Sequence, residues 1–371
     1  MTSGVCPISR GRSREAPGFA TVLVINGGVV PNGAEGTTGG ACGSPLVTVA
    51  IPTYRRPDLL RLAIQSALAQ NYRNTEILVS DSDASDEIAA LVASYSDPRL
   101  RYRRNDRPTN GLENALAMYR DARGELIATL HDDDLWDPNF LTVMVRPLVE
   151  DPTVVLTFAD HWVIDVKGNV SHTWTERFTR QYGRANLAEG RYQPFTKLAI
   201  VDGAVFFVVA TVFRNGLIDW DAVPPDVAPP YEMWLRYLAS RDGGAAYYVP
   251  QRLTWYRLHQ IAETETRFER PAVWIYDHIL LDERVADLRN EIMRTSALFR
   301  ASLGISLLAE GRVTEARQHL CQGLRAGAWR KGAAGLAISL LPPSRRADVV
   351  ARIRIETSRR RSHPYAENVN A

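Results

Sequence analysis

The stretch Leu126-Ile127-Ala128-Thr129-Leu130-His131-Asp132-Asp133-Asp134 joins a short apolar run to three consecutive carboxylates. The apolar run has the length and composition of a buried strand. Three adjacent negative charges repel one another, so a hard divalent cation that carries phosphate oxygens would stabilise them. The carboxyl end of a strand is also where open α/β sheets bind such ligands. The stretch therefore predicts a metal and phosphate site, and the alternative is a solvated acidic loop.

On both sides of this stretch, apolar runs of strand length alternate with segments of helical period. Strands are predicted over residues 46–51, 77–80, 100–103, 126–130 and 154–159, and helices over 58–69, 86–95 and 112–120. Alternation at this spacing is typical of βαβ crossovers. The fold class predicted is therefore α/β, with a Rossmann-like, mainly parallel sheet flanked by helices.

Four segments differ in composition along the chain. Residues 1–44 are rich in Gly, Ser, Thr and Pro without a sustained period, which predicts a mobile leader. Residues 45–150 carry the alternation and form the first half of the α/β domain. Residues 151–265 are more polar and aromatic, and we expect them to complete the sheet and to form one wall of a cleft. Residues 266–371 have helical period nearly throughout, with an antiparallel helix pair around Gly311.

Composition excludes some classes of protein and favours a cytoplasmic one. A net charge of +2 over 371 residues gives no reason to expect a nucleic-acid partner. Cys6, Cys42 and Cys321 are few and widely spaced, so a reducing, cytoplasmic setting is expected. No run approaches the roughly 18 apolar residues of a membrane-spanning helix. Arginines crowd the C-terminal end, which predicts an exposed helix with a frayed tail or, as the minor alternative, peripheral contact with an anionic membrane.

Two further strand ends carry polar side chains suited to a nucleotide. In Val49-Ala50-Ile51-Pro52-Thr53-Tyr54-Arg55-Arg56, a proline ends the strand and a loop with a hydroxyl and two cations follows. Such a loop can contact a base and a pyrophosphate. In Val79-Ser80-Asp81-Ser82-Asp83-Ala84-Ser85-Asp86, carboxylates can accept hydrogen bonds from a nucleobase N–H or a ribose hydroxyl. The structural alternative for this second segment is capping of the next helix by Ser85 or Asp86.

These motifs, in this order, resemble those of glycosyltransferase family 2 on the GT-A fold, over about residues 45–265. The resemblance implies that residues 45–150 are the nucleotide-sugar-binding half of that domain and residues 151–265 its acceptor-binding half. The resemblance implies that Asp133 and Asp134 bind a divalent metal, while His131 stands where the first acid of the motif usually stands. Whether Asp132 or Asp133 replaces that acid is left open. The other residues that the resemblance places at the donor nucleotide sugar are Pro52, Thr53, Tyr54, Arg56, Asp81, Asn110, Asn114, Asp132 and Asp133.

A fourth motif, Trp255-Tyr256-Arg257-Leu258-His259, is similar to the family's Y-R-x-H. The resemblance implies that His259 approaches the metal or the diphosphate. Imidazole is an acceptable ligand for a manganese-type ion. The alternative is that His259 is a structural residue.

The chain departs from the family pattern at Pro229-Pro230-Tyr231-Glu232-Met233-Trp234-Leu235-Arg236, where prolines stand in place of an acidic pair. An inverting transfer needs a carboxylate that takes the proton of the acceptor hydroxyl. Glu232 is the leading replacement, Asp226 is the second and Asp202 the third. The structural alternative for Glu232 is an acid that only stabilises a helix N-terminus.

The resulting hypothesis is a metal-dependent, inverting glycosyltransferase of polysaccharide or natural-product biosynthesis. It would use Mn²⁺ or Mg²⁺ and a nucleoside-diphosphate sugar, with UDP as the expected nucleotide. The acceptor would be a hydroxyl or amine of a saccharide, a lipid-linked saccharide or a small natural product. One alternative is a catalytically impaired nucleotide-sugar-binding or scaffold protein. Another is a sugar-phosphate nucleotidylyltransferase, although residues 52–57 lack the glycine-rich loop that such an enzyme needs.

Overall fold

The structure is a computed structural model that describes residues 44–205, 210–224, 227, 231–258 and 269–352. The predicted leader, residues 1–44, therefore lies outside the described residues except for its last one. From Ser44 onward the chain forms one compact unit.

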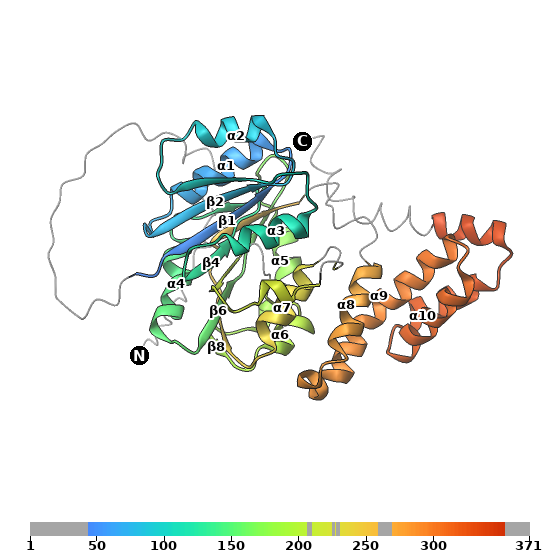
Figure 1. The fold of residues 1–371 in the computed structure, drawn as a ribbon. Helices are drawn as coiled ribbons and strands as arrows, with labels where there is room; N and C mark the ends of the chain where they lie inside the picture. The colour runs from blue at the N-terminus through green and yellow to red at the C-terminus, as the bar shows by residue number, and fades with distance from the viewer. Residues whose placement is uncertain (1–43, 206–209, 225–226, 228–230, 259–268, 353–371) are drawn as a thin grey trace, which may run out of the picture. The chain divides into compact units, whose positions relative to one another are not determined.

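Strands and helices alternate through the first part of this unit, and helices alone follow (Figure 1). The strands are β1 (Val47–Thr53), β2 (Thr75–Asp81), β3 (Leu100–Arg104), β4 (Leu126–Thr129), β5 (Leu135–Trp136), β6 (Val154–Ala159), β7 (Trp162–Ile164), β8 (Gly190–Tyr192), β9 (Thr211–Arg214), β10 (Ala245–Val249) and β11 (Thr254–Arg257). The α-helices are α1 (Pro57–Leu68), α2 (Asp86–Ala93), α3 (Gly111–Arg120), α4 (Phe140–Glu150), α5 (His172–Gln181), α6 (Thr196–Ile200), α7 (Glu232–Ser240), α8 (Glu269–Ile279), α9 (Arg289–Ala309), α10 (Val313–Arg325) and α11 (Trp329–Ser339). Short 3₁₀ turns are η2 (Arg184–Asn186), η3 (Trp220–Ala222) and η5 (Glu283–Leu288).

The main sheet has eight strands in the order β3-β2-β1-β4-β9-β6-β10-β8. All but β8 and β9 run in one direction, as the pairings of neighbouring strands show. The predicted α/β fold with a mainly parallel sheet is therefore confirmed. The difference lies in β9, which inserts antiparallel between β4 and β6 and pairs Val212 with both Ala128 and Thr157.

Both faces of the sheet are covered, which explains why its central strands read as continuous apolar runs. Along β1, Val47, Val49 and Ile51 pack on the side of α1, α2 and α4, while Ala50 packs on the side of α3, α6 and α7. All four side chains are fully buried. The side chains of a strand alternate between faces, so one seven-residue strand contributes to two cores.

A second sheet of three strands, β5-β11-β7, fixes the segment that follows the acidic stretch. Leu135 and Trp136 of β5 pair antiparallel with Trp255 and Thr254 of β11. This pairing brings β11, which ends at Arg257, against the chain that carries the three aspartates.

The C-terminal part consists of packed helices, as predicted. Helices α9 and α10 lie antiparallel, because Gly304 faces Leu320 while Gly323, further along α10, faces the earlier Ala297 and Ala301. A Cβ at Gly304 would lie 2.5 Å from the side chain of Leu320, so only glycine allows this approach. The turn between the two helices contains Gly311 with φ +77°.

One helical stretch, Glu283–Ala309, is long and apolar enough to cross a membrane by length and composition. The expectation that no run approaches this length is therefore not met in this stretch. Within the stretch, 56% of the most apolar window is buried inside the protein, which is the pattern of a core helix.

Candidate active site at the strand ends

The carboxyl ends of β1, β2 and β4 meet at one edge of the main sheet. Strand β1 lies between the other two and runs parallel to both, with Thr53 opposite Asp81 in the register. The backbone N–H of Ser82 donates to the carbonyl of Thr53 at 3.0 Å, so the loops after β1 and β2 remain joined beyond the sheet. Three motifs that are far apart in the sequence therefore meet here.

Asp132 binds the loop after β1. Its Oδ2 accepts hydrogen bonds from the Thr53 hydroxyl at 2.8 Å and the Tyr54 backbone N–H at 3.3 Å. Arg56 lies 3.6 Å from its other oxygen. Burial, and after it the charge of Asp133, raise the pKa of Asp132 to about 6 in spite of these partners. Asp132 thus holds the loop after β1 against the end of β4.

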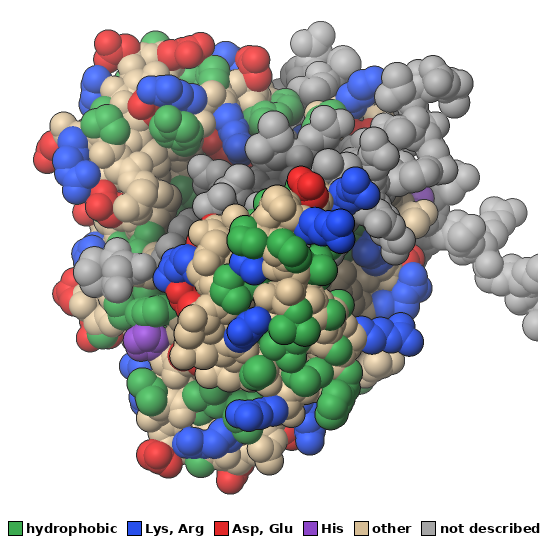
Figure 2. All heavy atoms as spheres, turned by 90° about the vertical axis from the view of Figure 1, so that its right-hand side faces the viewer, with side chains coloured by type: hydrophobic (Ala, Val, Ile, Leu, Met, Phe, Trp, Pro, Cys, Tyr) green, Lys and Arg blue, Asp and Glu red, His purple; other side chains and the backbone are tan. Residues whose placement is uncertain are grey.

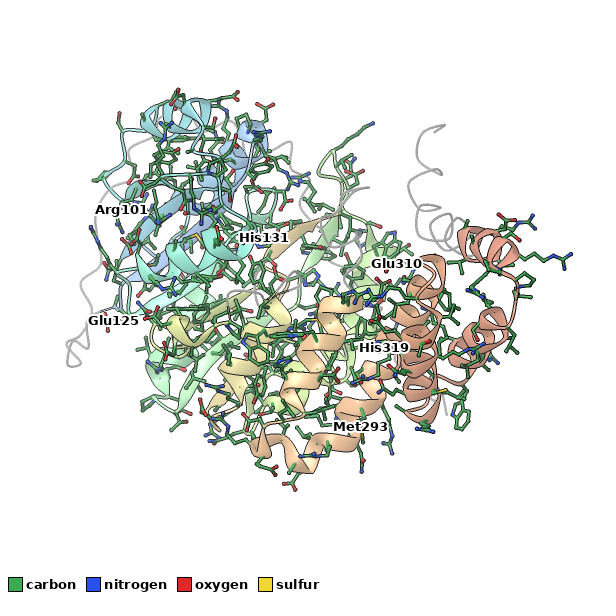
Figure 3. All side chains as sticks on the ribbon, turned by 45° about the vertical axis from the view of Figure 1, so that its right-hand side comes forward. Arg101, Glu125, His131, Met293, Glu310 and His319 are labelled. Carbon is green, nitrogen blue, oxygen red and sulfur yellow. The ribbon has the colours of Figure 1, made fainter. Side chains whose placement is uncertain are left out.

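His131, Asp133 and Asp134 form a candidate metal site. One ligand atom from each lies within 4.8 Å of the others (His131 is labelled in Figure 3). Asp134 is fully buried, and its Oδ1 accepts the backbone N–H of Arg257 at 2.8 Å. Its Oδ2 is buried without a hydrogen-bond partner among the described residues. Burial, and after it the charge of Asp133, raise the pKa of Asp134 well above its usual value. Two carboxylates and an imidazole fit a divalent cation such as Mn²⁺.

Two arginines hold the acidic segment in place. Arg56 contacts Oδ2 of Asp133 at 2.7 Å. The guanidinium of Arg257 is directed to backbone carbonyls instead, and it donates to those of Asp133 at 2.8 Å and Asp165 at 3.0 Å. Arg257 is 5% exposed, so it acts as a buried brace that positions Asp133 and Asp134.

Asp81 is fully buried at the end of β2. Its carboxylate accepts the backbone N–H groups of Asp83 at 2.9 Å and Ser85 at 2.7 Å, and the hydroxyl of Tyr102 at 3.0 Å. Ser85 in turn caps α2 by accepting the N–H of Glu87 at 3.2 Å. Ser85 therefore caps α2, as the structural alternative predicts, while Asp81 holds the loop before that helix by hydrogen bonds.

The two asparagines assigned to the donor have different surroundings. Asn110 caps α3, where its side chain accepts the N–H of Glu113 at 2.9 Å. Asn114 is 1% exposed, and its amide bonds to Ser80 and to Asn105. Asn114 therefore braces the end of β2 from within the core.

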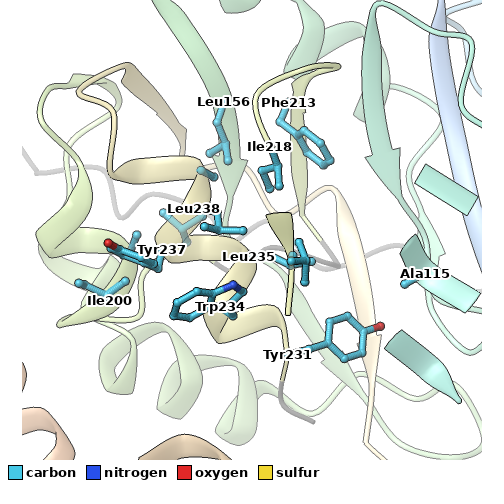
Figure 4. Packing of buried hydrophobic residues seen from close by; sticks show 14 of the residues in the cluster. Ala115, Leu156, Ile200, Phe213, Ile218, Tyr231, Trp234, Leu235, Tyr237 and Leu238 are labelled. Carbon is cyan, nitrogen blue, oxygen red and sulfur yellow. The ribbon is translucent and has the colours of Figure 1, made fainter. Parts of the chain in front are cut away.

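Glu232 begins α7, in the position expected for either a base or a helix-terminal acid. Its charge acts on the phenol of Tyr256: burial first, and then the charges of Asp134, Asp133 and Glu232 among others, raise the pKa of Tyr256. Packing fixes the start of α7, because Tyr231 points toward α3 at Ala115 (Figure 4). The same helix packs Leu235 and Leu238 into the main core.

The other predicted residues divide into two groups. Asp202, the third candidate base, is paired with Lys197 at 2.9 Å. Asp226 and His259 lie outside the described residues.

Sequence reasoning missed three features of this edge. His131 was noted only as a departure from the acidic motif, yet its ring reaches Asp133 and Asp134. Arg257 belongs to the predicted fourth motif, but no function was predicted for it. Asp160 follows the buried strand β6 directly, and the rule that singled out the acids after β4 would have found it too.

Comparison with known proteins agrees with this geometry. Residues 48–207 match the family described as Glycosyl transferase family 2. An uncharacterised protein of Mycobacterium tuberculosis is 30% identical over 251 residues, which cover 64% of this chain and 75% of the relative. The chain belongs to the family 2 glycosyltransferases. It is accordingly an enzyme, a glycosyltransferase, as the sequence motifs indicated.

Solved structures show that this glycosyltransferase has the GT-A fold. The mannosyltransferase PcManGT from Pyrobaculum calidifontis, in complex with GDP-Man and Mn²⁺, is 18% identical with a TM-score of 0.52, over 84% of this chain and 85% of that one. S. aureus TarS, residues 1–349 in complex with UDP-GlcNAc, is 11% identical with a TM-score of 0.54, over 76% and 81% of the two chains. At these identities the likeness establishes the fold alone.

Proposed function

We propose that the protein is a metal-dependent, inverting glycosyltransferase that transfers a sugar from a UDP-sugar to a hydroxyl or amine of its acceptor. The observation that carries the proposal is the buried Oδ2 of Asp134, which has no hydrogen-bond partner among the described residues and lies in a cluster with His131 and Asp133. A buried carboxylate oxygen is costly unless something neutralises it. A cation would do so, and PcManGT was solved with Mn²⁺.

Within this proposal, Asp133, Asp134 and His131 hold the cation. When bound, Mn²⁺ or Mg²⁺ supplies Lewis-acid stabilisation of the charge on the departing diphosphate. The Thr53 hydroxyl donates to Asp132, and Arg56 contacts Asp133. Both side chains therefore lie beside the proposed metal ligands, which suits groups that orient the pyrophosphate. TarS was solved with UDP-GlcNAc, which supports a UDP-sugar as the donor.

Glu232 is the proposed base. The acceptor oxygen forms a bond to the anomeric carbon while the bond from that carbon to the diphosphate breaks, and Glu232 takes the proton from the acceptor. Its charge and those of Asp133 and Asp134 act on the same Tyr256 phenol, which supports a position near the donor. The acceptor class stays open between saccharides, lipid-linked saccharides and small natural products, and the reaction is proposed to take place in the cytoplasm.

The test combines binding and turnover. Purified protein is incubated with radiolabelled UDP-, GDP- and dTDP-sugars, with and without Mn²⁺, and both hydrolysis and thermal stabilisation are measured. We expect Mn²⁺-dependent release of nucleoside diphosphate that disappears in Asp134→Asn. The matched control is Asp287→Asn, an exposed acid on η5. Glu232→Gln should lower turnover and leave nucleotide binding unchanged. Binding without turnover across acceptors would favour the scaffold alternative instead.

A further inference from the structure

The C-terminal helices carry a charge bias that the active site does not use. Between residues 316 and 347 the chain has six basic residues and no Asp or Glu, although its net charge is only +2. The six cations are Arg317, Arg325, Arg330, Lys331, Arg345 and Arg346. This segment spans most of α10, all of α11 and the start of the following helical turns.

Helix α11 and its C-cap expose two large apolar side chains to solvent. Trp329 is 67% exposed and Leu340, at its C-cap, is 77% exposed. Ala333 and Ala337 lie between them and are also exposed, and the spacings of four, four and three residues place all of these on one side of the helix.

The opposite side of α11 packs against the protein through two glycines, Ile338 and Ser339. Gly332 approaches Leu324 of α10, and Gly335 approaches Leu320 so closely that an added Cβ would lie 2.2 Å from it. Gly332, Gly335 and Ile338 therefore face the protein, while Trp329 and Leu340 face outward. Core packing does not explain Trp329 and Leu340.

Cations border this outward side. Arg330 and Lys331 follow Trp329 directly, and the exposed Arg345 lies shortly after Leu340. Figure 2 looks onto the C-terminal helices, where hydrophobic and basic side chains are interspersed with few acidic ones among them. The outward side of α11 with its flanking cations, from Arg325 to Arg346, is called the α11 face below.

We propose that the α11 face docks onto an anionic membrane surface. An apolar side that carries a Trp, bordered by Arg and Lys, is the composition of a helix that lies in the headgroup region of a bilayer. Trp is favoured at that depth because its ring is apolar and its N–H is polar. A second copy of the chain fits poorly, since pairing two α11 faces would bring like charges together. Anionic headgroups complement the charge, and acyl chains cover the apolar stripe.

Vesicle co-sedimentation of the full chain tests the proposal. The probes are vesicles of phosphatidylglycerol mixed with phosphatidylcholine and vesicles of phosphatidylcholine alone. We expect binding to the anionic vesicles, weaker binding to the neutral ones, and a decrease with added salt. Trp329→Ser with Leu340→Ser should weaken binding about tenfold or more, since two large apolar side chains no longer enter the bilayer. Arg330→Gln with Arg345→Gln should weaken it about thirty-fold, from about 1 kcal/mol per cation.

The matched control is Leu281→Ser, because Leu281 is 78% exposed but lies outside the α11 face, and it should bind as the parent does. Thermal melts of all variants check that the fold is kept. No binding to anionic vesicles, or equal binding by parent and face variants, would overturn the proposal. So would a dimer in light scattering that Trp329→Ser dissociates, since the face would then join two copies. Binding is measured without nucleotide or metal, so its outcome does not depend on whether the protein is an active glycosyltransferase.

Discussion

Asp160 and Asp134 are two buried carboxylates at the same edge of the main sheet, and their surroundings differ. Asp160, after β6, has both oxygens occupied: Arg184 contacts Oδ1 at 2.9 Å, and Arg252 and Thr179 contact Oδ2 at 2.8 and 2.7 Å. Asp134, after β4, has a backbone partner for one oxygen and no hydrogen-bond partner among the described residues for the other.

The pKa shifts follow the same division. Burial acts to raise the pKa of both carboxyls. At Asp160 the charge of Arg184 and the hydrogen bonds from Arg252 and Thr179 outweigh burial, and the pKa is lowered. At Asp134 burial and the charge of Asp133 prevail, and the pKa is raised. The chain supplies its own cations to Asp160, which marks a structural site, whereas Asp134 has the surroundings expected of a ligand for an external cation.

The largest expected effect is on activity at Asp134. Asp134→Asn should reduce turnover by at least about a thousandfold, because a metal supplies several kcal/mol of transition-state stabilisation. The melting temperature should hold or rise, since removing one of three adjacent charges relieves repulsion. Steady-state kinetics with Mn²⁺ and a thermal melt measure the two effects. A collapse of the melt would show that Asp134 is structural, like Asp160.

Asp160→Asn should show the opposite pattern, with a large loss of stability. Arg184 is 1% exposed and would lose its counter-ion, and breaking a buried pair in this way costs about 3–5 kcal/mol. Urea unfolding of the parent, of Asp160→Asn and of the exposed control Asp287→Asn measures the difference. A change as small as that of the control would remove the contrast between the two carboxylates.

Acid should remove the advantage that Asp160 provides. Its pKa in the folded protein is lowered, so the folded state keeps it ionised while the unfolded state takes up a proton below its ordinary pKa of about 3.9. Stability from this group is therefore complete above about pH 4 and falls as the pH drops below that value. Melting temperatures from pH 6 to 3 should show the gap between parent and Asp160→Asn narrowing only below about pH 4. A constant gap across this range would contradict the assignment.

The smallest expected effect is at Arg257, which holds the acidic segment through the carbonyl of Asp133. Arg257→Gln should weaken Mn²⁺ binding by about 10- to 100-fold, the usual result of losing a group that orients metal ligands. Its backbone N–H still serves Asp134, so the effect is partial. Calorimetric titration with Mn²⁺ measures it, and the exposed Arg146→Gln is the control. Equal affinities would mean that the brace does not position the ligands.

Much of the fold and part of the site could be predicted from the sequence. Strand β6 (Val154–Ala159) has the predicted bounds, because a buried strand needs an unbroken apolar run and turns flank it. Strand β9 was not predicted, since its direction depends on neighbours that are remote in the chain. The family resemblance assigned the metal to Asp133 and Asp134, and the structure brings these two side chains together. That His131 joins them depends on backbone geometry, which spacing does not give.

The sequence by itself determined the layered α/β fold and the family, because hydrophobic period and short motifs are local properties of the chain. It also determined which strand ends carry acids. Only the tertiary structure decided what each acid does, since the cations that satisfy Asp160 come from η2 and from the segment after β10, 24 and 92 residues away. Charge compensation is a matter of distance in space, and the same Asp side chain is a structural partner in one place and a candidate ligand in the other.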